Sequence, residues 1–502
     1  MAGETRIRRF AALAASITLV GTILSSCAPG ATPPAVGGDP SNDPAWLTAV
    51  RGNDAGVYDE FGRRVVLRGV NLNHLGDYFV SDPRLPTTSP LTEDDWDDLD
   101  AQGVNVVRLV TTWSAWQPTR GVLDTDYLAR VDAAVDAARR HGIHVVLDMH
   151  QDAWSKFVFT PSAETCPPGT HHQIGWDGAP AWATYTDGFP TCTPESREDS
   201  PAVRRAWENF YGNRDGIRTE LSKLWGTLAA HYADEPTIAG FDLLNEPGPG
   251  FDADGTIVGL TAFYREAIGA IRSAEAVAGG RGHIVFFEST VHGGFVPFDF
   301  SDDPNLVWTP HNYAESIGPK ITGLMDLLFG AQRLLRAGYG TAMWTGEYGF
   351  FGDDDAEKMA RYAPLDDATL ADGGAGGTWW QWEQECGDPH DVSGAYPPSE
   401  QWVLDQIGRC GDSRSDLVCS DRAYPRAVPG RLTGVWTGCR GPLTVAGTTA
   451  TAASADLWFP TSSATPPTVS GPGVGAVEAT RVGTSGWRLT VMVSGSYRID
   501  VS

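Results

Sequence analysis

Residues 238–247 read IAGFDLLNEP, an apolar run that closes on Asn245, Glu246 and a proline. A short apolar run of this kind is typical of a strand buried on both faces of a parallel sheet. Residues 342–347 read AMWTGE, so they repeat the pattern and close on Glu347. Two glutamates at the carboxyl ends of two such strands predict a pair of carboxylates at one edge of the sheet.

Eight apolar runs of this kind follow one another along the chain. They are Val65–Asn71, Val104–Val110, His144–His150, Ile238–Asn245, His283–Glu288, Leu306–His311, Ala342–Glu347 and Thr378–Trp382. Longer stretches separate them, such as Asp124–His141, where apolar residues recur three and four apart and Gly142 ends the predicted helix. Eight strands alternating with helices over about 380 residues predict an α/β fold, a (β/α)8 TIM barrel with insertions.

Composition divides the 502 residues into four parts. Residues 1–27 combine a basic start and an apolar run with the ending Leu-Ser-Ser-Cys27, which resembles a bacterial lipobox and predicts a lipoprotein signal peptide with lipidation at Cys27. Residues 28–44, rich in Pro, Gly and Ala, predict a disordered tether. We assign the catalytic barrel to residues 45–428. Short Thr- and Val-rich segments predict a small C-terminal β-sandwich over residues 429–502.

Charge and cysteine content bear on the partners and on the compartment. The net charge of −26 argues against nucleic acid as a partner, because binding a polyanion needs clustered Lys and Arg. We expect an exported protein, anchored at the cell surface through Cys27 or secreted. The six other cysteines are an even number, which suits disulfides outside the cytoplasm. The expected pairs are Cys166–Cys192, Cys410–Cys419 and Cys386–Cys439.

The active site of a TIM barrel lies at the carboxyl ends of its strands. The polar and aromatic residues at or just beyond the predicted strand ends are Arg108, His150, Asp152, Asn245, Glu246, His311, Tyr313, Glu347, Trp380 and Trp382. A retaining glycosidase uses one carboxylic acid to protonate the leaving oxygen, and a carboxylate about 5–5.5 Å away to attack the anomeric carbon. Glu246 as acid/base and Glu347 as nucleophile fit these roles.

The set Arg108, His150, Asn245, Glu246, His311, Tyr313, Glu347 and Trp380, in this chain order, resembles the constellation of glycoside hydrolase family 5 over about residues 50–425. The resemblance implies double displacement with retention, in which a raised pKa keeps Glu246 protonated while Glu347 is ionised. We expect no metal and no cofactor.

The resemblance also implies a role for each neighbour of the two glutamates. Arg108 would hydrogen-bond the nucleophile and Tyr313 would orient it. Asn245 would donate to the sugar 2-hydroxyl, and Trp380 would floor the sugar subsite. By the same resemblance, His150 and His311 would donate to sugar hydroxyls and to the acid/base neighbourhood, and Trp382 would support the site from behind.

Within the family, four features resemble bacterial endoglycoceramidases, which cut the bond between an oligosaccharide and ceramide. The features are the Met149–Asp152 segment, the long loop after it, the apolar stretch 314–339 and the C-terminal β domain. The resemblance implies a glycosphingolipid substrate that contacts Asp152 and, in the first loop, Asp77. It also implies peripheral membrane association through the N-terminal lipid and apolar loops, and we expect a monomer.

One departure concerns the first sugar. Endoglycoceramidases that act on glucosylceramide-based glycans have a lysine after the first strand, whereas this chain has no lysine before Lys156. Asn73, His74 and Asp77 occupy that loop instead, which favours an endogalactosylceramidase type of preference. Two alternatives stay open: a cellulase-like or mannanase-like endoglycanase acting on polysaccharide, and a noncatalytic surface lipoprotein that binds glycans.

Overall fold

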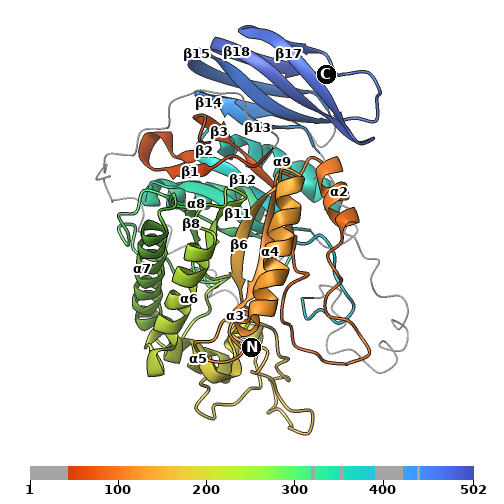
Figure 1. The fold of residues 1–502 in the computed structure, drawn as a ribbon. Coiled ribbons are helices and arrows are strands. Elements are labelled where there is room, and N and C mark those ends of the chain that lie inside the picture. The colour runs from red at the N-terminus through yellow and green to blue at the C-terminus, as the bar shows by residue number, and fades with distance from the viewer. Residues whose placement is uncertain (1–42, 318–320, 322, 351–354, 391–421, 438–440) are drawn as a thin grey trace.

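The computed structural model describes residues 43–317, 321, 323–350, 355–390, 422–437 and 441–502, which contain one parallel and one antiparallel sheet (Figure 1). The predicted signal peptide, Cys27 and all but the last two residues of the tether lie outside these residues. No helix among those described is both long enough and apolar enough to span a membrane.

The parallel sheet closes into the predicted TIM barrel. Its strands are β4 (Leu67–Leu72), β5 (Val106–Thr112), β6 (His144–His150), β7 (Ile238–Asp242), β8 (Ile284–Phe287), β9 (Leu306–Trp308), β10 (His311–Asn312), β11 (Ala342–Tyr348) and β12 (Gly374–Trp379). The sheet closes because β9, at one end of the strand order, pairs with β11 near the other end, where β10 also pairs with β11. The last barrel strand, β12, pairs with the first, β4. Since β9 and β10 are two pieces of one broken strand, the barrel has eight strands and confirms the predicted fold.

The last barrel strand begins earlier than the sequence predicts. Its first half is rich in glycine rather than in apolar residues, so the apolar signal begins only at Thr378. Gly376 has φ +93°, and a Cβ there would lie 2.3 Å from the carbonyl oxygen of Leu67 on the paired strand. Close approach of the two strands therefore requires glycine and removes the hydrophobic pattern.

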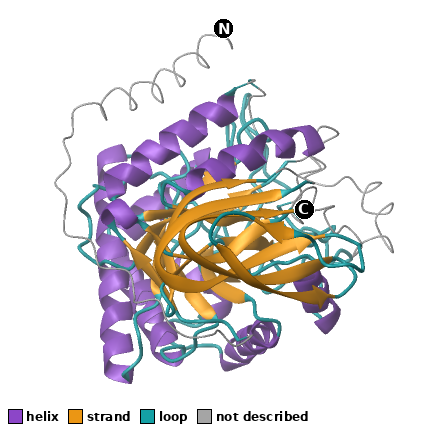
Figure 2. Cartoon of the chain, turned by 90° about the horizontal axis from the view of Figure 1, so that it is seen from above, coloured by secondary structure: helices purple, strands orange, loops and turns teal. Residues whose placement is uncertain are grey.

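Helices lie around the strands in the view from above (Figure 2). They are α2 (Glu93–Ala101), α3 (Trp113–Trp116), α4 (Thr125–Arg140), α5 (Pro201–Tyr211), α6 (Ile217–His231), α7 (Ala253–Ala278), α8 (Leu324–Tyr339) and α9 (Asp355–Leu370), with short 3₁₀ turns η2 (Gly52–Asp54), η3 (Ala181–Ala183), η4 (Arg197–Asp199) and η5 (Arg214–Gly216). Helix α4 confirms the helix predicted over Asp124–His141. The side chain of Asp124 caps it by accepting bonds from two backbone N–H groups of the first turn.

The antiparallel sheet draws on both ends of the described chain. Its strands are β1 (Leu47–Val50), β2 (Gly56–Asp59), β3 (Arg63–Val65), β13 (Tyr424–Pro429), β14 (Arg431–Trp436), β15 (Leu443–Pro460), β16 (Val469–Ser470), β17 (Val474–Val482) and β18 (Gly486–Val501). The predicted domain assignment placed residues 45–65 in the barrel, whereas β1 to β3 join this sheet through the pairing of β3 with β13. The composition of residues 45–65 cannot predict this pairing, because β13 lies more than 350 residues further along the chain.

The antiparallel sheet packs on the amino-terminal ends of the barrel strands (Figure 1). The Tyr424 hydroxyl donates to the carbonyl of Gly103, just before β5, at 2.7 Å. Leu47 on β1 and Val57 on β2 share an apolar cluster with barrel residues such as Val106. Because this end of the barrel is covered, the functional side chains lie at the opposite end, where the strands finish.

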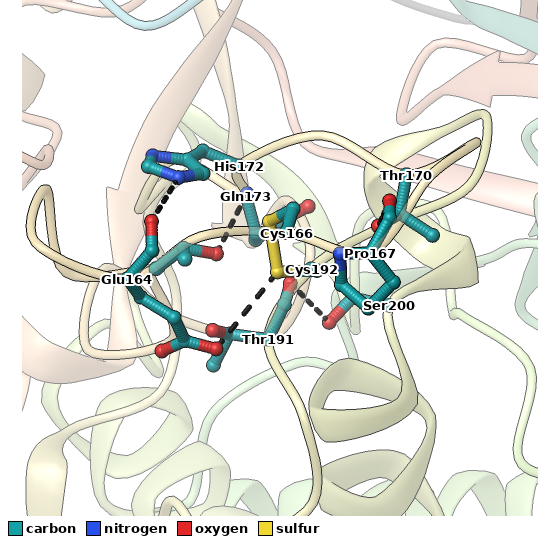
Figure 3. The surroundings of a disulfide bond; sticks show 10 residues. Glu164, Cys166, Pro167, Thr170, His172, Gln173, Thr191, Cys192 and Ser200 are labelled. Carbon is teal, nitrogen blue, oxygen red and sulfur yellow. Dashed lines mark hydrogen bonds between the residues drawn. A yellow bond between two sulfur atoms is a disulfide. The ribbon is translucent and has the colours of Figure 1, made fainter.

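A long insertion follows β6 at that functional end. The predicted disulfide Cys166–Cys192 is confirmed and staples the insertion, with the two Cα atoms 5.7 Å apart (Figure 3). Cys386 is also disulfide-bonded. The cysteines at 410, 419 and 439, named in the other two predicted pairs, lie outside the described residues.

Candidate active site

Glu246 follows the end of β7 in a backbone conformation that is unusual for a residue with a side chain, with φ +37°. Two side chains hold it there. Its N–H donates to Glu288 Oε2 at 3.0 Å, and Gln151 Nε2 donates to the carbonyl oxygens of Asn245 and Glu246 at 2.7 and 2.9 Å. Its carboxylate oxygens lie 2.9 Å from His311 Nδ1 and 3.3 Å from an Arg197 nitrogen.

Glu347 is the second-last residue of β11 and is buried. Oε1 accepts a hydrogen bond from Arg108 at 2.8 Å, and Oε2 accepts one from the Tyr313 hydroxyl at 2.7 Å. His311 Nδ1 lies 3.3 Å from the same Oε2. These contacts fix the carboxylate in one orientation and satisfy both oxygens, as a nucleophile held in place requires.

The separation of the two glutamates indicates the class of mechanism. One carboxylate oxygen of Glu246, one of Glu347 and a ring nitrogen of His311 all lie within 4.8 Å of one another. Inverting glycosidases hold their carboxyl groups about 6.5–9.5 Å apart to admit a water molecule, whereas retaining enzymes hold them about 5–5.5 Å apart. The spacing found here fits direct attack by one glutamate and proton donation by the other.

Arg108 lies on β5 at the centre of the site and is fully buried. Its guanidinium donates to three further carboxylates besides Glu347: Asp148 and Asp242 at 2.9 Å and Glu288 at 3.3 Å. It also donates to the side-chain oxygens of Asn71 and Asn245, at 3.2 and 3.0 Å. Burial alone would lower the pKa of Arg108, but the four carboxylates raise it well above its ordinary value.

His311 lies between three carboxylates. Nδ1 faces Glu246 and Glu347, and Nε2 lies 3.2 Å from Glu288 Oε1. Burial would lower the pKa of His311, but these carboxylates raise it well above its ordinary value, so the ring is a cation in the free site.

The free site corrects the expected protonation of the acid/base. Burial would raise the pKa of Glu246, but the hydrogen bond and charge of His311, with the charge of Arg197, lower it instead. Burial raises the pKa of Glu347 against the opposing charges of His311 and Arg108. The transferable proton therefore resides on His311, one 2.9 Å hydrogen bond away from Glu246.

The residues predicted to bind the sugar lie on one side of the glutamate pair. Trp380, at the end of β12, stacks on His150 with ring centroids 5.3 Å apart. His150 Nδ1 lies 2.7 Å from Asp148, and burial lowers the pKa of this histidine to about 3. With Nδ1 directed at Asp148, neutral His150 leaves Nε2 for a sugar hydroxyl. Asn245 Nδ2 lies 3.4 Å from that Nε2.

Two predicted residues lie apart from this set. Asp77 accepts a hydrogen bond from Ser114 at 2.7 Å and pairs with Lys156 Nζ at 2.6 Å. The first loop has no lysine of its own, but Lys156 of the insertion after β6 contacts it through Asp77. The Trp382 side chain turns toward α2 and donates to Asp95 at 3.3 Å, so it supports the barrel wall.

Several site residues escaped the sequence analysis. Glu288 had a usable signal, because it ended a predicted strand, and Asp148 and Asp242 are acidic residues inside apolar runs. Arg197 and His390 had none, because both lie in long irregular segments. His390 pairs with Asp152 at 2.8 Å and with Asp388 at 2.7 Å.

Curated relatives resemble only part of the chain. Endoglycoceramidase I of Rhodococcus hoagii is 33% identical over 212 residues, which is 41% of this chain and 38% of that protein. An endoglycoceramidase of Hydra vulgaris is 29% identical over 206 residues, or 38% of this chain and 39% of that protein. The matched regions therefore span well under half the length of these relatives.

Solved structures and a family model match more of the chain. The structure of an endogalactoceramidase is 37% identical with a TM-score of 0.79, over 91% of this chain and 100% of that one. Endo-glycoceramidase II from Rhodococcus sp., in complex with ganglioside GM3, shares the fold at 24% identity and a TM-score of 0.66, over 89% and 99% of the two chains. Residues 58–385 match the model of the cellulase family. The chain therefore belongs to the cellulase family of glycosyl hydrolases, family 5.

Proposed function

We propose that the protein is a retaining glycosidase that hydrolyses the β-glycosidic bond between sugar and ceramide in glycosphingolipids. The observation that carries the reaction class is the pair Glu246 and Glu347, held within 4.8 Å through His311 at the carboxyl ends of β7 and β11. The substrate class rests on the similarity to an endogalactoceramidase and on apolar surface beside the site.

The mechanism follows from the contacts of the pair. Glu347, oriented by Arg108 and Tyr313, attacks the anomeric carbon and forms a glycosyl ester. His311 passes its proton across the 2.9 Å hydrogen bond to Glu246, and Glu246 gives that proton to the departing ceramide oxygen. A water molecule then attacks the ester while Glu246 takes its proton, so the anomeric configuration is retained.

Exposed apolar side chains follow several site residues along the chain and would fit a lipid leaving group. Phe157 and Phe159 are exposed in the insertion after β6, and Ile317 is exposed just after Tyr313. Helix α8, a few residues further on, exposes Leu327 and Leu334 while it packs Met325 and Phe329 inward. Exposed large apolar residues that gather into one patch commonly bind lipid or protein, and we propose that these residues do so.

The same surface supports peripheral association with a membrane. Helix α8 would rest its exposed leucines in the interface while Cys27, if lipidated, tethers the chain. Export and anchoring through Cys27 belong to the proposal, as does action as a monomer.

For the first sugar we propose a galactose attached to ceramide. Asp77, in the loop after β4, forms an ion pair with Lys156 from the insertion. This loop therefore presents a carboxylate paired with a lysine, rather than a lysine of its own. The 37% identity with an endogalactoceramidase favours the same choice.

A panel of fluorescent galactosylceramide, glucosylceramide and a soluble cellooligosaccharide tests the proposal. We expect ceramide release from the galactosylceramide, little from glucosylceramide, and none of either activity in the Glu347→Ser variant. Cleavage of the soluble oligosaccharide alone would establish an endoglycanase. Binding of the glycolipids without any cleavage would favour a noncatalytic lipoprotein.

A further inference from the structure

A line of alternating charges runs through the site beside the catalytic pair. Asp388 lies 2.7 Å from His390 Nδ1, and His390 Nε2 lies 2.8 Å from Asp152. The other oxygen of Asp152 accepts a hydrogen bond from Arg197 NH2. The same Arg197 nitrogen lies 3.3 Å from Glu246 Oε2. One guanidinium nitrogen thus contacts both the acid/base and Asp152.

We infer that Arg197 is a positioning residue for the acid/base, which ties Glu246 to Asp152 and so aligns proton donation with the sugar bound beside it. The inference rests on the proposed function, because it concerns the same reaction. It gives a specific role to the insertion after β6, from which Arg197 comes.

The insertion is built to hold Arg197 rigidly. Its guanidinium lies over the Trp176 ring, 4.5 Å from the centroid, and its Nε donates to Glu198 at 3.2 Å. The Cys166–Cys192 disulfide closes the segment just before η4, and the Ser200 hydroxyl donates to the carbonyl of Thr191 at 3.0 Å (Figure 3). A planar guanidinium fixed on an aromatic face loses little side-chain freedom when it bridges two carboxylates.

Arg197 contacts the carboxylate oxygen of Glu246 that does not contact His311. Oε1 lies 2.9 Å from His311, whereas Oε2 faces Arg197. The other charged groups around Glu246 are Glu347 and Asp152, with Glu288 beneath its backbone N–H and Arg108 beyond Glu347. Loss of the Arg197 charge would raise the proton affinity of Glu246, and loss of the bridge would free its side chain to rotate.

The test compares two leaving groups. A ceramide alkoxide needs a proton from Glu246, whereas a dinitrophenolate departs without one. For Arg197→Gln we expect kcat/KM on the accepted fluorescent glycolipid to fall on the order of 10–100-fold. On the dinitrophenyl glycoside of the same sugar it should fall no more than about threefold, since acid catalysis is not needed there. The basic limb of the kcat/KM profile should also move to higher pH.

Two variants guard the interpretation. Arg197→Lys keeps the charge but loses the planar group that lies over Trp176 and the Nε bond to Glu198, so the cation is no longer held in place. We therefore expect the basic limb to stay in place while glycolipid turnover falls. The Arg197→Lys variant also tests the proposal if Arg197→Gln does not fold. Arg205→Gln is the matched control, because Arg205 lies nearby on α5 and pairs with Glu208 at 2.7 Å, outside the site. It should resemble the wild type with both substrates.

Equal losses on the two substrates, with an unmoved basic limb, would overturn the inference and leave Arg197 a structural residue. A wild-type protein that cleaves neither substrate would instead contradict the proposed function. The two failures are therefore distinguishable in one set of assays.

Discussion

At Arg108 one buried guanidinium meets four carboxylates, and only Glu347 among them is placed to react. Asp148, Asp242 and Glu288 would remain with Arg108 if Glu347 were replaced. The positive charge would therefore keep buried partners, which is the condition for a variant that loses catalysis without losing its fold.

For Glu347→Ser we expect glycolipid hydrolysis to fall by about 10⁴-fold or more, because no other carboxylate is positioned to form the glycosyl ester. The thermal midpoint should stay close to that of the wild type. Turnover and thermal unfolding measured on the same preparation check both parts. Near-normal turnover would contradict the nucleophile assignment.

The Tyr313 hydroxyl stabilises ionised Glu347 through its 2.7 Å hydrogen bond. Tyr313→Phe removes a bond to the charged form, so the pKa of Glu347, already raised by burial, should rise further. Because the nucleophile must be ionised, the acidic limb of kcat/KM should move to higher pH, with the largest loss of activity at low pH. A pH–rate profile of both proteins measures this, and an unmoved acidic limb would count against it.

The glutamate pair could be predicted from the sequence because each residue ends an apolar strand. Arg197 could not, since its position depends on how an irregular insertion folds back over β7. The protonation of Glu246 was predicted with the opposite sign because the charges of His311 and Arg197 become neighbours only in three dimensions.

At the scale of elements, α8 is divided between packing and exposure. Met325 and Phe329 are buried, whereas Leu327 and Leu334 are each 55% exposed. The sequence predicted an apolar stretch over residues 314–339, and the resemblance implied membrane association through apolar loops. The structure shows one buried face and one exposed face on this helix.

Replacing Leu327 and Leu334 together by Asn should weaken hydrolysis of glycolipid in phospholipid vesicles, with loss of about 1 kcal/mol or more of interfacial binding per leucine. Activity in detergent micelles should change little. Val258→Asn with Val277→Asn on α7 is the matched control, because these valines are 70% and 89% exposed on another helix. An equal loss of vesicle activity in the leucine and valine double variants would argue against α8 as the membrane contact. So would unchanged vesicle activity in the leucine double variant.

The insertion after β6 depends on the Cys166–Cys192 disulfide. Replacing both cysteines by Ser should lower the free energy of unfolding of this segment by roughly 3 kcal/mol. This is the conformational entropy that a disulfide closing a loop of this size removes from the unfolded chain. Limited proteolysis should then cut first between residues 157 and 200. Unchanged proteolytic resistance would mean that packing alone holds the insertion.

At the scale of the molecule, the two sheets are joined at the closed end of the barrel. Strand β3 leads directly into β4, and it pairs with β13 across the chain. Arg422 pairs with Asp366 and Asp367 of α9 at 2.5 and 2.7 Å, so it ties the start of β13 to a barrel helix. Composition suggested two consecutive domains because it could not register this pairing of distant segments.

The shared sheet predicts that the two parts unfold together. Calorimetry should show one cooperative transition. Arg422→Met should lower its midpoint, at a cost of about 3 kcal/mol, because the buried carboxylates of Asp366 and Asp367 would keep only the longer contacts of 3.3 and 3.5 Å to Arg68. Two separate transitions, with only the smaller one moved by Arg422→Met, would mean that the antiparallel sheet is an independent domain.

The most direct test of the central claim is to trap the glycosyl-enzyme. A 2-deoxy-2-fluoroglycosyl fluoride of the accepted sugar forms the ester quickly and releases it slowly, so peptide mass spectrometry can locate the modified residue. We predict one adduct, on the peptide that carries Glu347. An adduct on another residue, or continued hydrolysis with inversion and no adduct, would contradict the account.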